Sequence, residues 1–113
     1  MVVRMIEVKV FDPPLCCPTG VCGPAPDTRI IDFMEAIVKL QKEYEGSIGV
    51  LRGSMGRDFA IFMGDQEVVS LIRKLGIQAL PIVKVNGRVA FQGSYPNYEM
   101  LEQEVRKEAS RIG

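Results

Sequence analysis

The amino-acid sequence predicts an α/β fold in which helices flank a four-stranded mixed sheet. Three patterns support this prediction. Apolar and charged residues alternate near the amino end, apolar residues then recur every three or four positions, and an Asn-Gly pair later separates two apolar runs. The first two patterns are typical of a strand followed by a helix, and the third is typical of a tight hairpin. We therefore expect parallel pairing early in the chain and antiparallel pairing late in it.

The first strand is expected over Val2–Phe11, because apolar and charged side chains alternate from Ile6 to Val10. Pro13 and Pro14 end this strand, since a proline has no backbone N–H to donate to a neighbouring strand. The segment that follows is rich in proline and glycine, and it is expected to form a loop.

The first helix is expected from Asp27 or Thr28 to about Glu45. Either of the first two side chains can cap the helix, its apolar residues repeat at intervals of three and four, and Gly46 ends it. The short β-branched run Ser47–Arg52 then predicts a second strand. Because a helix connects the two strands, the crossover rule predicts that they lie parallel.

The middle of the chain is less regular. Gly53–Met63 contains two glycines before a late apolar run, and we interpret it as a loop that leads into a turn. Asp65 is a good N-cap for a second helix over Gln66–Leu75, which Gly76 ends. The apolar residues of this helix form one stripe, which predicts that one of its faces is buried.

The last third of the chain predicts a hairpin and a helix. Leu80–Val85 is expected to be a strand, Asn86-Gly87 a type I′ turn, and Arg88–Gln92 the returning strand. Pro96 fits the first turn of a final helix, because the fixed φ of proline suits that position.

The resulting order is β-α-β-α-β-β-α, which is the arrangement of thioredoxin-like folds with helices on both faces of the sheet. Pro81 falls where such folds place a cis proline beside the functional loop. We therefore expect a cis Leu80-Pro81 bond with a shaping role. No repeat, low-complexity tract or linker divides the chain, so residues 1–113 are expected to form a single domain.

The composition narrows the function classes. Fourteen basic and fourteen acidic residues cancel, which gives no electrostatic reason to expect binding to nucleic acids or membrane surfaces. The absence of histidine removes the usual catalytic base, so any chemistry falls to thiols, carboxylates or the backbone. There is no signal-peptide pattern and no apolar stretch of about 18 residues, which predicts a cytoplasmic protein without a membrane span.

The cysteines are the most informative functional feature. Cys16, Cys17 and Cys22 lie in one seven-residue window, and the chain has no others. This clustering indicates that the sulfurs act together, either as ligands of a soft ion or as redox partners. An odd number excludes a closed disulfide framework, and the cytoplasm keeps thiols reduced. The positive end of the helix expected after them favours the thiolate form.

Three thiolates without a hard ligand suit an ion that accepts three sulfurs, and trivalent arsenic or antimony fits that description. Zinc would require a fourth ligand, for which only Asp12 or water is near in the sequence. Two alternatives remain. The cysteines could be buried without a role, or Cys17 and Cys22 could form the dithiol of a thioredoxin-like thiol-disulfide oxidoreductase. Four residues separate this pair, whereas two separate thioredoxin-type pairs.

The other candidate residues carry weaker signals. Asp12 could orient a thiol or accept a proton, but an Asp before two prolines more often caps a turn. Tyr95 and Tyr98 are expected to cover the hairpin. Basic residues such as Arg52 and Arg73 are interleaved with acidic ones, so a solvated surface is expected for them.

The cysteine-containing stretch resembles the signature of a known family. It reads Val10-Phe11-Asp12-Pro13-Pro14-Leu15-Cys16-Cys17-Pro18-Thr19-Gly20-Val21-Cys22-Gly23. The ArsD family of arsenical resistance metallochaperones and weak trans-acting repressors has the similar string Phe-Asp-Pro-x-x-Cys-Cys-x-Thr-Gly-Val-Cys-Gly. A second block of similarity extends the resemblance to nearly the whole chain and consists of Leu80-Pro81, Asn86-Gly87, Gly93 and Tyr95-Pro96.

The resemblance implies a thioredoxin-like fold and a carrier rather than an enzyme. It implies that Cys16, Cys17 and Cys22 bind trivalent arsenic or antimony as cargo, without an organic cofactor, and deliver it to the ATPase subunit of an arsenite efflux pump. Glutathione complexes would supply the metalloid. The resemblance also implies a homodimer and, through the repressor role, operator DNA as a partner. The chain shows no helix-turn-helix pattern and no basic patch, so we expect DNA binding to be weak.

Overall fold

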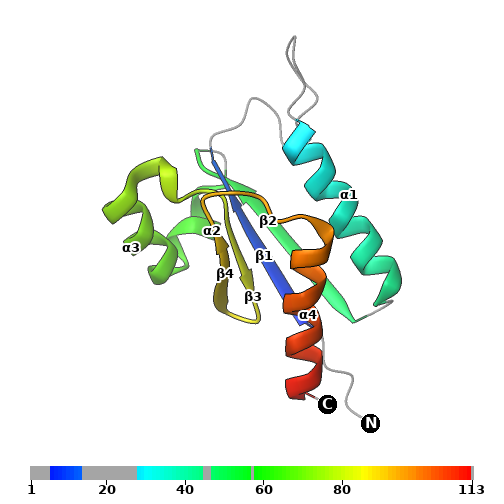
Figure 1. Cartoon of the computed structure of the whole chain (residues 1–113). Helices are drawn as coiled ribbons and strands as arrows, with labels where there is room; N and C mark the ends of the chain where they lie inside the picture. Colours follow the sequence, from blue (N-terminus) through cyan, green and yellow to red (C-terminus); the bar gives the residue numbers. More distant parts are fainter. Residues whose placement is uncertain (1–5, 14–27, 45–46, 57, 113) are drawn as a thin grey trace.

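A computed structural model describes residues 6–13, 28–44, 47–56 and 58–112 of the chain. Its centre is a four-stranded mixed sheet in the order β2-β1-β3-β4, with helices on both faces (Figure 1). This is the thioredoxin-like arrangement that the order of elements predicts, and it confirms the predicted fold class. No helix among the residues just given is long and apolar enough to cross a membrane.

Strand β1 (Ile6–Asp12) lies inside the sheet between two neighbours. It pairs in parallel with β2 (Ile48–Ser54) and antiparallel with β3 (Ile82–Val85), which pairs antiparallel with β4 (Arg88–Gln92). The parallel pairing of β1 and β2 confirms the crossover prediction. The part of the first strand predicted over residues 2–5 lies outside the described residues.

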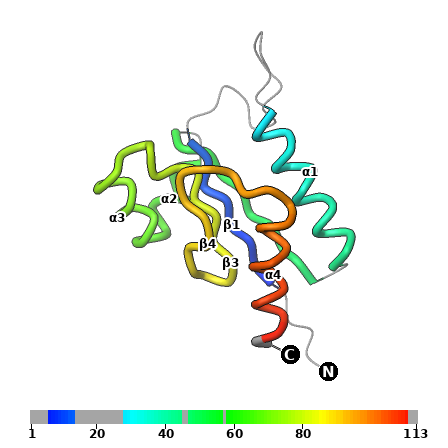
Figure 2. The backbone as a smooth tube through the Cα atoms, viewed as in Figure 1, coloured from blue at the N-terminus to red at the C-terminus, as the bar shows by residue number. Residues whose placement is uncertain are grey.

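The helices form two layers. Helices α1 (Thr28–Glu43) and α4 (Tyr98–Ile112) cover one face of the sheet. Helices α2 (Phe59–Met63) and α3 (Gln66–Leu75), followed by the short 3₁₀ helix η1 (Gly76–Ala79), cover the other (Figure 2). The molecule therefore has three layers, with the sheet in the middle.

The alternation of β1 decides which side chain enters which layer. Val8 and Val10 point to the face covered by α1 and α4, whereas Phe11 points to the opposite face. Phe11 packs edge-on against Phe62 of α2, with the ring centroids 5.4 Å apart. Burying each of these side chains stabilises the fold by about 1.5–3 kcal/mol, so the two clusters hold both helical layers to the sheet.

Two local predictions are confirmed at the ends of β3. Asn86 and Gly87 have positive φ angles of 50° and 85°, as a type I′ turn requires. The Asn86 side chain also accepts a hydrogen bond of 2.9 Å from the Glu7 backbone N–H, which ties the turn to β1. At the other end of β3, the Leu80-Pro81 bond is cis, as expected from its position in the fold.

The segment after β2 differs from the prediction. Gly53–Met63, interpreted from the sequence as a loop leading into a turn, contains the five-residue helix α2. This helix packs so closely on β2 that a Cβ atom at Gly53 would lie 2.9 Å from the Ile61 side chain. Gly53 therefore makes room for a helix, whereas two glycines in a short window ordinarily indicate a loop.

Helix α4 begins later than predicted, and it carries a buried charged residue. Pro96 precedes the helix instead of lying in its first turn, because Asn97 is the capping residue and its Oδ1 accepts from the Met100 N–H at 2.9 Å. Glu108 is buried although it is charged. Its carboxylate accepts hydrogen bonds from the side chains of Asn86 (3.2 Å) and Arg88 (3.1 Å), which come from the distant hairpin.

Helix α3 has the predicted bounds, but its apolar stripe is only partly covered. The Asp65 side chain accepts from the Val68 N–H at 3.1 Å, which confirms the predicted N-cap. Val68 is fully buried, whereas Leu75 at the other end is exposed. The prediction of a buried face is therefore confirmed only in part, since α3 packs mainly on the short α2 and η1.

A partly buried ion pair joins the start of α3 to the sheet. Lys84 of β3 lies 2.8 Å from Asp65 and 3.0 Å from Glu67. Burial alone would raise the pKa of Asp65, but hydrogen bonds from Lys84 and the Val68 N–H outweigh burial and lower this pKa. Because the folded-state pKa is depressed, the stabilisation is present above the unfolded pKa and is lost as the pH falls through the folded value.

Replacing Asp65 by asparagine tests this pair. Asn keeps the helix cap but leaves Lys84 with one carboxylate partner, so we expect Asp65→Asn to lower the free energy of unfolding at neutral pH by about 1–2 kcal/mol. The difference from the unmodified chain should shrink as the pH falls from about 5 towards about 2. Chemical denaturation measures it, with the exposed Asp32→Asn as control. A difference that is independent of pH would contradict the assignment.

Candidate functional site

The predicted ligands Cys16, Cys17 and Cys22 lie outside the described residues, so their role as a metalloid site stays a prediction. The structure describes what surrounds that stretch in the chain. Strand β1 ends at Asp12 before it, and α1 begins at Thr28 after it. Both of these ends lie at the same edge of the molecule (Figure 1).

Asp12 is the centre of a buried polar cluster at this edge. Only 1% of the residue is exposed, and its carboxylate accepts hydrogen bonds on both oxygens. Tyr95 donates its hydroxyl to Oδ1 at 2.5 Å, and Arg52 donates its Nε–H to Oδ2 at 2.6 Å. The cluster thus joins the end of β1 to β2 and to the segment between β4 and α4. We call these three residues the Asp12 cluster.

The register of the sheet explains why Arg52 reaches Asp12. Val10 and Asp12 point to the same face of β1, and the parallel pairing sets Arg52 of β2 opposite Val10. Arg52 is therefore the diagonal neighbour of Asp12 on the same face, within reach of a long side chain. The prediction of a solvated surface position for Arg52 is wrong, because the guanidinium turns towards the carboxylate.

The Asp12 cluster consists of an ion pair, between Arg52 and Asp12, and the neutral phenol of Tyr95. Burial, and then the hydrogen bond to the Asp12 carboxylate, raise the pKa of Tyr95 well above its ordinary value. Tyr95 is thus a neutral hydrogen-bond donor at physiological pH. The Arg52 Nη2 atom is buried and has no hydrogen-bond partner among the described residues. It is the one buried side-chain atom of that kind in the part of the chain that the structure covers.

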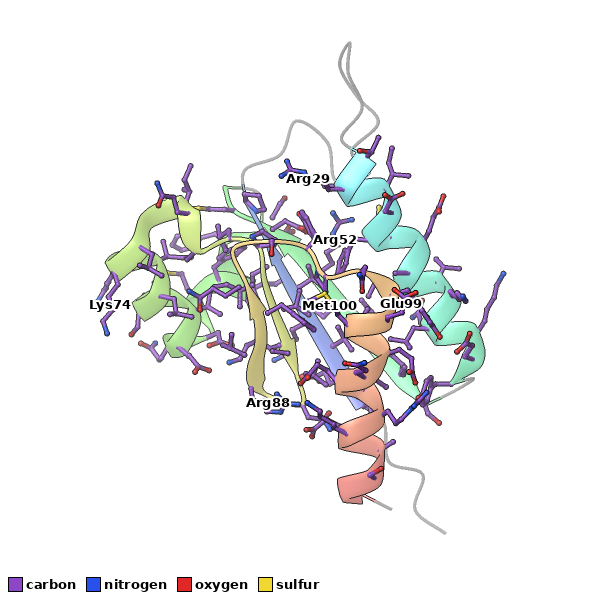
Figure 3. The ribbon with its side chains drawn as sticks, viewed as in Figure 1. Arg29, Arg52, Lys74, Arg88, Glu99 and Met100 are labelled. Carbon is purple, nitrogen blue, oxygen red and sulfur yellow. The ribbon has the colours of Figure 1, made fainter. Side chains whose placement is uncertain are left out.

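Tyr95 extends the cluster to the first helix. Its ring packs against Phe33 of α1, with centroids 5.0 Å apart and an angle of 43° between the rings. Figure 3 shows Arg52 at the same end of the molecule as Arg29, which lies in the first turn of α1. The end of β1 and the start of α1, which flank the cysteine-containing stretch in the sequence, are therefore connected through Tyr95.

The cis proline borders the same edge. Phe11 of β1 pairs with Ile82 of β3 in the antiparallel register. Pro81 comes directly before Ile82, so it lies beside the end of β1. The Pro81 carbonyl accepts from the Gly93 N–H at 2.9 Å, which links it to the segment that carries Tyr95. Two sequence-predicted positions, Asp12 and Pro81, thus come together here.

The sequence interpretation missed two members of the cluster. Tyr95 was expected to cover the hairpin, but its hydroxyl donates a hydrogen bond to Asp12. The signal for Arg52 is weak yet present: it is the only charged residue in the apolar run Ile48–Ser54. Both oxygens of Asp12 accept hydrogen bonds from residues distant in the sequence, so we assign this carboxylate to the frame of the site. Its expected roles as a turn cap or as a partner of a thiol concern residues that the structure does not describe, and they stay predictions.

Comparison with known proteins decides the family. The sequence profile described as "Arsenical resistance operon protein ArsD" matches residues 5–112. The chain belongs to the ArsD family. An ArsD sequence from Halobacterium salinarum is 30% identical over 97 residues, which are 86% of this chain and 88% of that one. The Escherichia coli arsenical resistance operon trans-acting repressor ArsD is 29% identical over 92 residues, 81% of this chain and 74% of its own length.

Solved structures agree with this assignment. The arsenical resistance operon trans-acting repressor from Bacteroides vulgatus superposes with a TM-score of 0.75 at 29% identity, covering 88% of this chain and 92% of that chain. A Staphylococcus aureus protein of unknown function shares the fold alone, with a TM-score of 0.60 at 15% identity over 95% of this chain and 94% of its own. The ArsD resemblance that the cysteine motif indicates is therefore confirmed at the level of family and fold.

Proposed function

We propose that this ArsD-family chain is a metallochaperone, in which Cys16, Cys17 and Cys22 bind one trivalent arsenic or antimony and deliver it to an arsenite efflux ATPase. The observation that carries the proposal is the clustering of all three cysteines of the chain in one seven-residue window, within the residues that match the ArsD family. Soft thiolates suit these ions, and the names of the relatives connect the family with arsenical resistance.

The binding step needs no redox partner. Arsenite enters as As(OH)₃, and each thiol replaces one hydroxyl group: an As–S bond forms, an As–O bond breaks, and the hydroxyl leaves as water with the thiol proton. Three replacements leave the arsenic bound to three sulfurs and release three waters. Arsenic stays trivalent throughout, so the protein acts as a carrier and not as an enzyme.

The transfer step repeats the same exchange between proteins. A thiol of the ATPase loses its proton and attacks the bound arsenic as a thiolate. One As–S bond forms as one to the carrier breaks, and the departing carrier thiolate takes up a proton in place of the one released. Glutathione complexes would load the carrier by the reverse arrangement, with glutathione as the leaving thiol. Because each lost sulfur is replaced as it leaves, no free ion is needed.

The Asp12 cluster supports this proposal by fixing the frame. The cysteine motif begins on β1, where Phe11 and Asp12 are both buried, and α1 packs on Tyr95 through Phe33. A frame that is already ordered lowers the entropy cost of bringing several ligands to one atom. Such preorganisation favours tight binding while the exchange chemistry keeps it reversible.

Calorimetric titration of the reduced protein with arsenite tests the proposal. One arsenite should bind per chain. For each arsenic bound, three thiols should become unreactive towards a thiol reagent. Absence of saturable binding would overturn the metallochaperone assignment. An insulin-reduction assay tests the alternative in which Cys17 and Cys22 form a redox pair, since appreciable turnover would favour an oxidoreductase.

A second candidate function is metalloid-responsive repression, with a homodimer as the expected form. The names of two relatives, which describe them as trans-acting repressors of an arsenical resistance operon, favour repression. The balanced charge of the chain predicts that binding to operator DNA is weak. In a gel-shift assay with promoter DNA from its own operon, we expect a retarded band at a protein concentration on the order of 10 µM, and arsenite should remove it. No band, or one that arsenite leaves unchanged, would count against repression.

A further inference from the structure

Exposed apolar side chains gather on the layer formed by α2, α3 and η1. Of the seven large hydrophobic residues that are exposed among the described residues, four lie on these three short helices. They are Phe59 (71% exposed), Ile77 (57%), Leu75 (48%) and Met63 (46%). The other three are spread over α1, β2 and α4. A local concentration of this kind is typical of a surface that contacts another molecule.

A groove runs between α2 and α3 within this layer. Its volume is about 150 Å³, and its lining is almost entirely apolar. A space of this size accepts one aromatic ring or one leucine side chain, whereas small-molecule pockets are ordinarily about 300–1,000 Å³. The lining includes two methionines, which adapt to different partner side chains. The residues that line it include Met55, Phe59, Phe62, Met63, Val69 and Ile72.

The charge at the groove itself is positive, since Arg73 is the one charged side chain among the described residues that line it. The carboxylates of this layer have partners: Asp58 accepts from the Ser54 N–H at 2.8 Å, and Asp65 and Glu67 pair with Lys84. Arg73 lines the groove, and Lys74 is the next residue of α3. Neither side chain makes a hydrogen bond or an ion pair with any described residue. Figure 3 shows Lys74 at the outer edge of α3, away from the sheet.

We propose that the groove between α2 and α3 is a docking site for an acidic amphipathic helix of a partner protein. One large apolar side chain of that helix fills the groove, and its carboxylates face Arg73 and Lys74. The positive charges select an acidic helix over a basic one. Cations in the last turn of a helix also complement its dipole, but the dipole does not account for the apolar groove beside them. This site does not depend on the proposed metalloid chemistry.

A pair of synthetic peptides tests the proposal on the full chain. The first is a fluorescent amphipathic helix of about four turns, with leucines along one face and glutamates on the other. The second has the same leucines and lysines in place of the glutamates. At about 0.15 M salt we expect the acidic peptide to bind with a Kd on the order of 10 µM and the basic peptide at least about tenfold more weakly. Equal binding of the two peptides, or binding of neither, would overturn the proposal.

Variants locate the binding. Phe59→Ser should weaken the acidic peptide about tenfold, and the double variant Arg73→Glu and Lys74→Glu should make the chain prefer the basic peptide. Met100→Ser and Lys42→Glu are matched controls, exposed on α4 and α1, and they should leave binding unchanged. Thermal melts check that each variant is folded. If the controls weaken binding as much, or the Phe59 variant binds normally, the groove is not the site.

Two further measurements distinguish helix docking from metalloid binding and from self-association. A chain in which all three cysteines are serine should bind the acidic peptide as well as the unmodified chain does. If the unmodified chain binds the acidic peptide but does not bind arsenite, the proposed function is overturned and the docking proposal still stands. Sedimentation of the chain alone tests whether a second copy occupies the face. Self-association that Phe59→Ser abolishes would show a homodimer interface and overturn the docking proposal.

Discussion

Changing any one of Cys16, Cys17 and Cys22 to serine is expected to weaken arsenite binding by at least on the order of a hundredfold. A serine hydroxyl is a harder ligand and a poorer nucleophile than a thiolate, so each change removes one of three As–S bonds. A hundredfold loss corresponds to about 2.7 kcal/mol, which is modest for a ligand bond. Calorimetry of the three reduced variants measures the effect.

The matched control is Thr19→Ser, which changes the same stretch of sequence but keeps the three thiols. It should bind arsenite within about twofold of the unmodified chain. Circular dichroism should show an unchanged helix and sheet content in all four proteins. If one of the three cysteine variants keeps full affinity, that thiol is not a ligand and the site has at most two sulfurs.

Removing the carboxylate of Asp12 is expected to be the most destabilising single change in the described part of the site. Asp12→Ala leaves the Arg52 guanidinium without its ion-pair partner and the Tyr95 hydroxyl without its acceptor. Breaking such a pair inside a protein costs about 3–5 kcal/mol, and Arg52 is 18% exposed, so we expect a value near the lower end. Chemical denaturation at neutral pH measures it.

Milder variants rank the contributions of the individual hydrogen bonds of the Asp12 cluster to the free energy of unfolding. Tyr95→Phe removes one hydrogen bond and should cost about 1 kcal/mol. Asp12→Asn keeps an oxygen acceptor and should fall between Tyr95→Phe and Asp12→Ala, while the exposed Asp32→Ala should change stability by less than about 0.5 kcal/mol. Folded Asp12→Asn should still bind one arsenite per chain, because Asp12 belongs to the frame. Loss of binding in the folded variant would instead make it a ligand.

Features set by neighbouring residues could be predicted from the sequence. Asn86-Gly87 specifies its own turn through positive φ angles, and Asp65 caps α3 through a bond to a residue three positions later. The alternation of β1 and the crossover through α1 give the parallel pair. These signals need no knowledge of the rest of the fold, and the structure confirms them.

Features set by distant residues could not be predicted in this way. The helix α2 forms because Phe62 packs on Phe11 and because Gly53 admits Ile61, and neither contact is visible in a local pattern. Asp12 and Arg52 are 40 residues apart, and they meet only because the sheet register makes them diagonal neighbours. The cysteine motif is the opposite case, since its spacing is evident in the sequence.

X-ray absorption of the arsenic-loaded, reduced protein counts the ligands of the proposed three-sulfur site. We expect three sulfur neighbours around each arsenic and no oxygen neighbour, with one arsenic per chain. Two sulfurs and one oxygen, or fewer than two sulfurs, would contradict the assignment of Cys16, Cys17 and Cys22 as a common site.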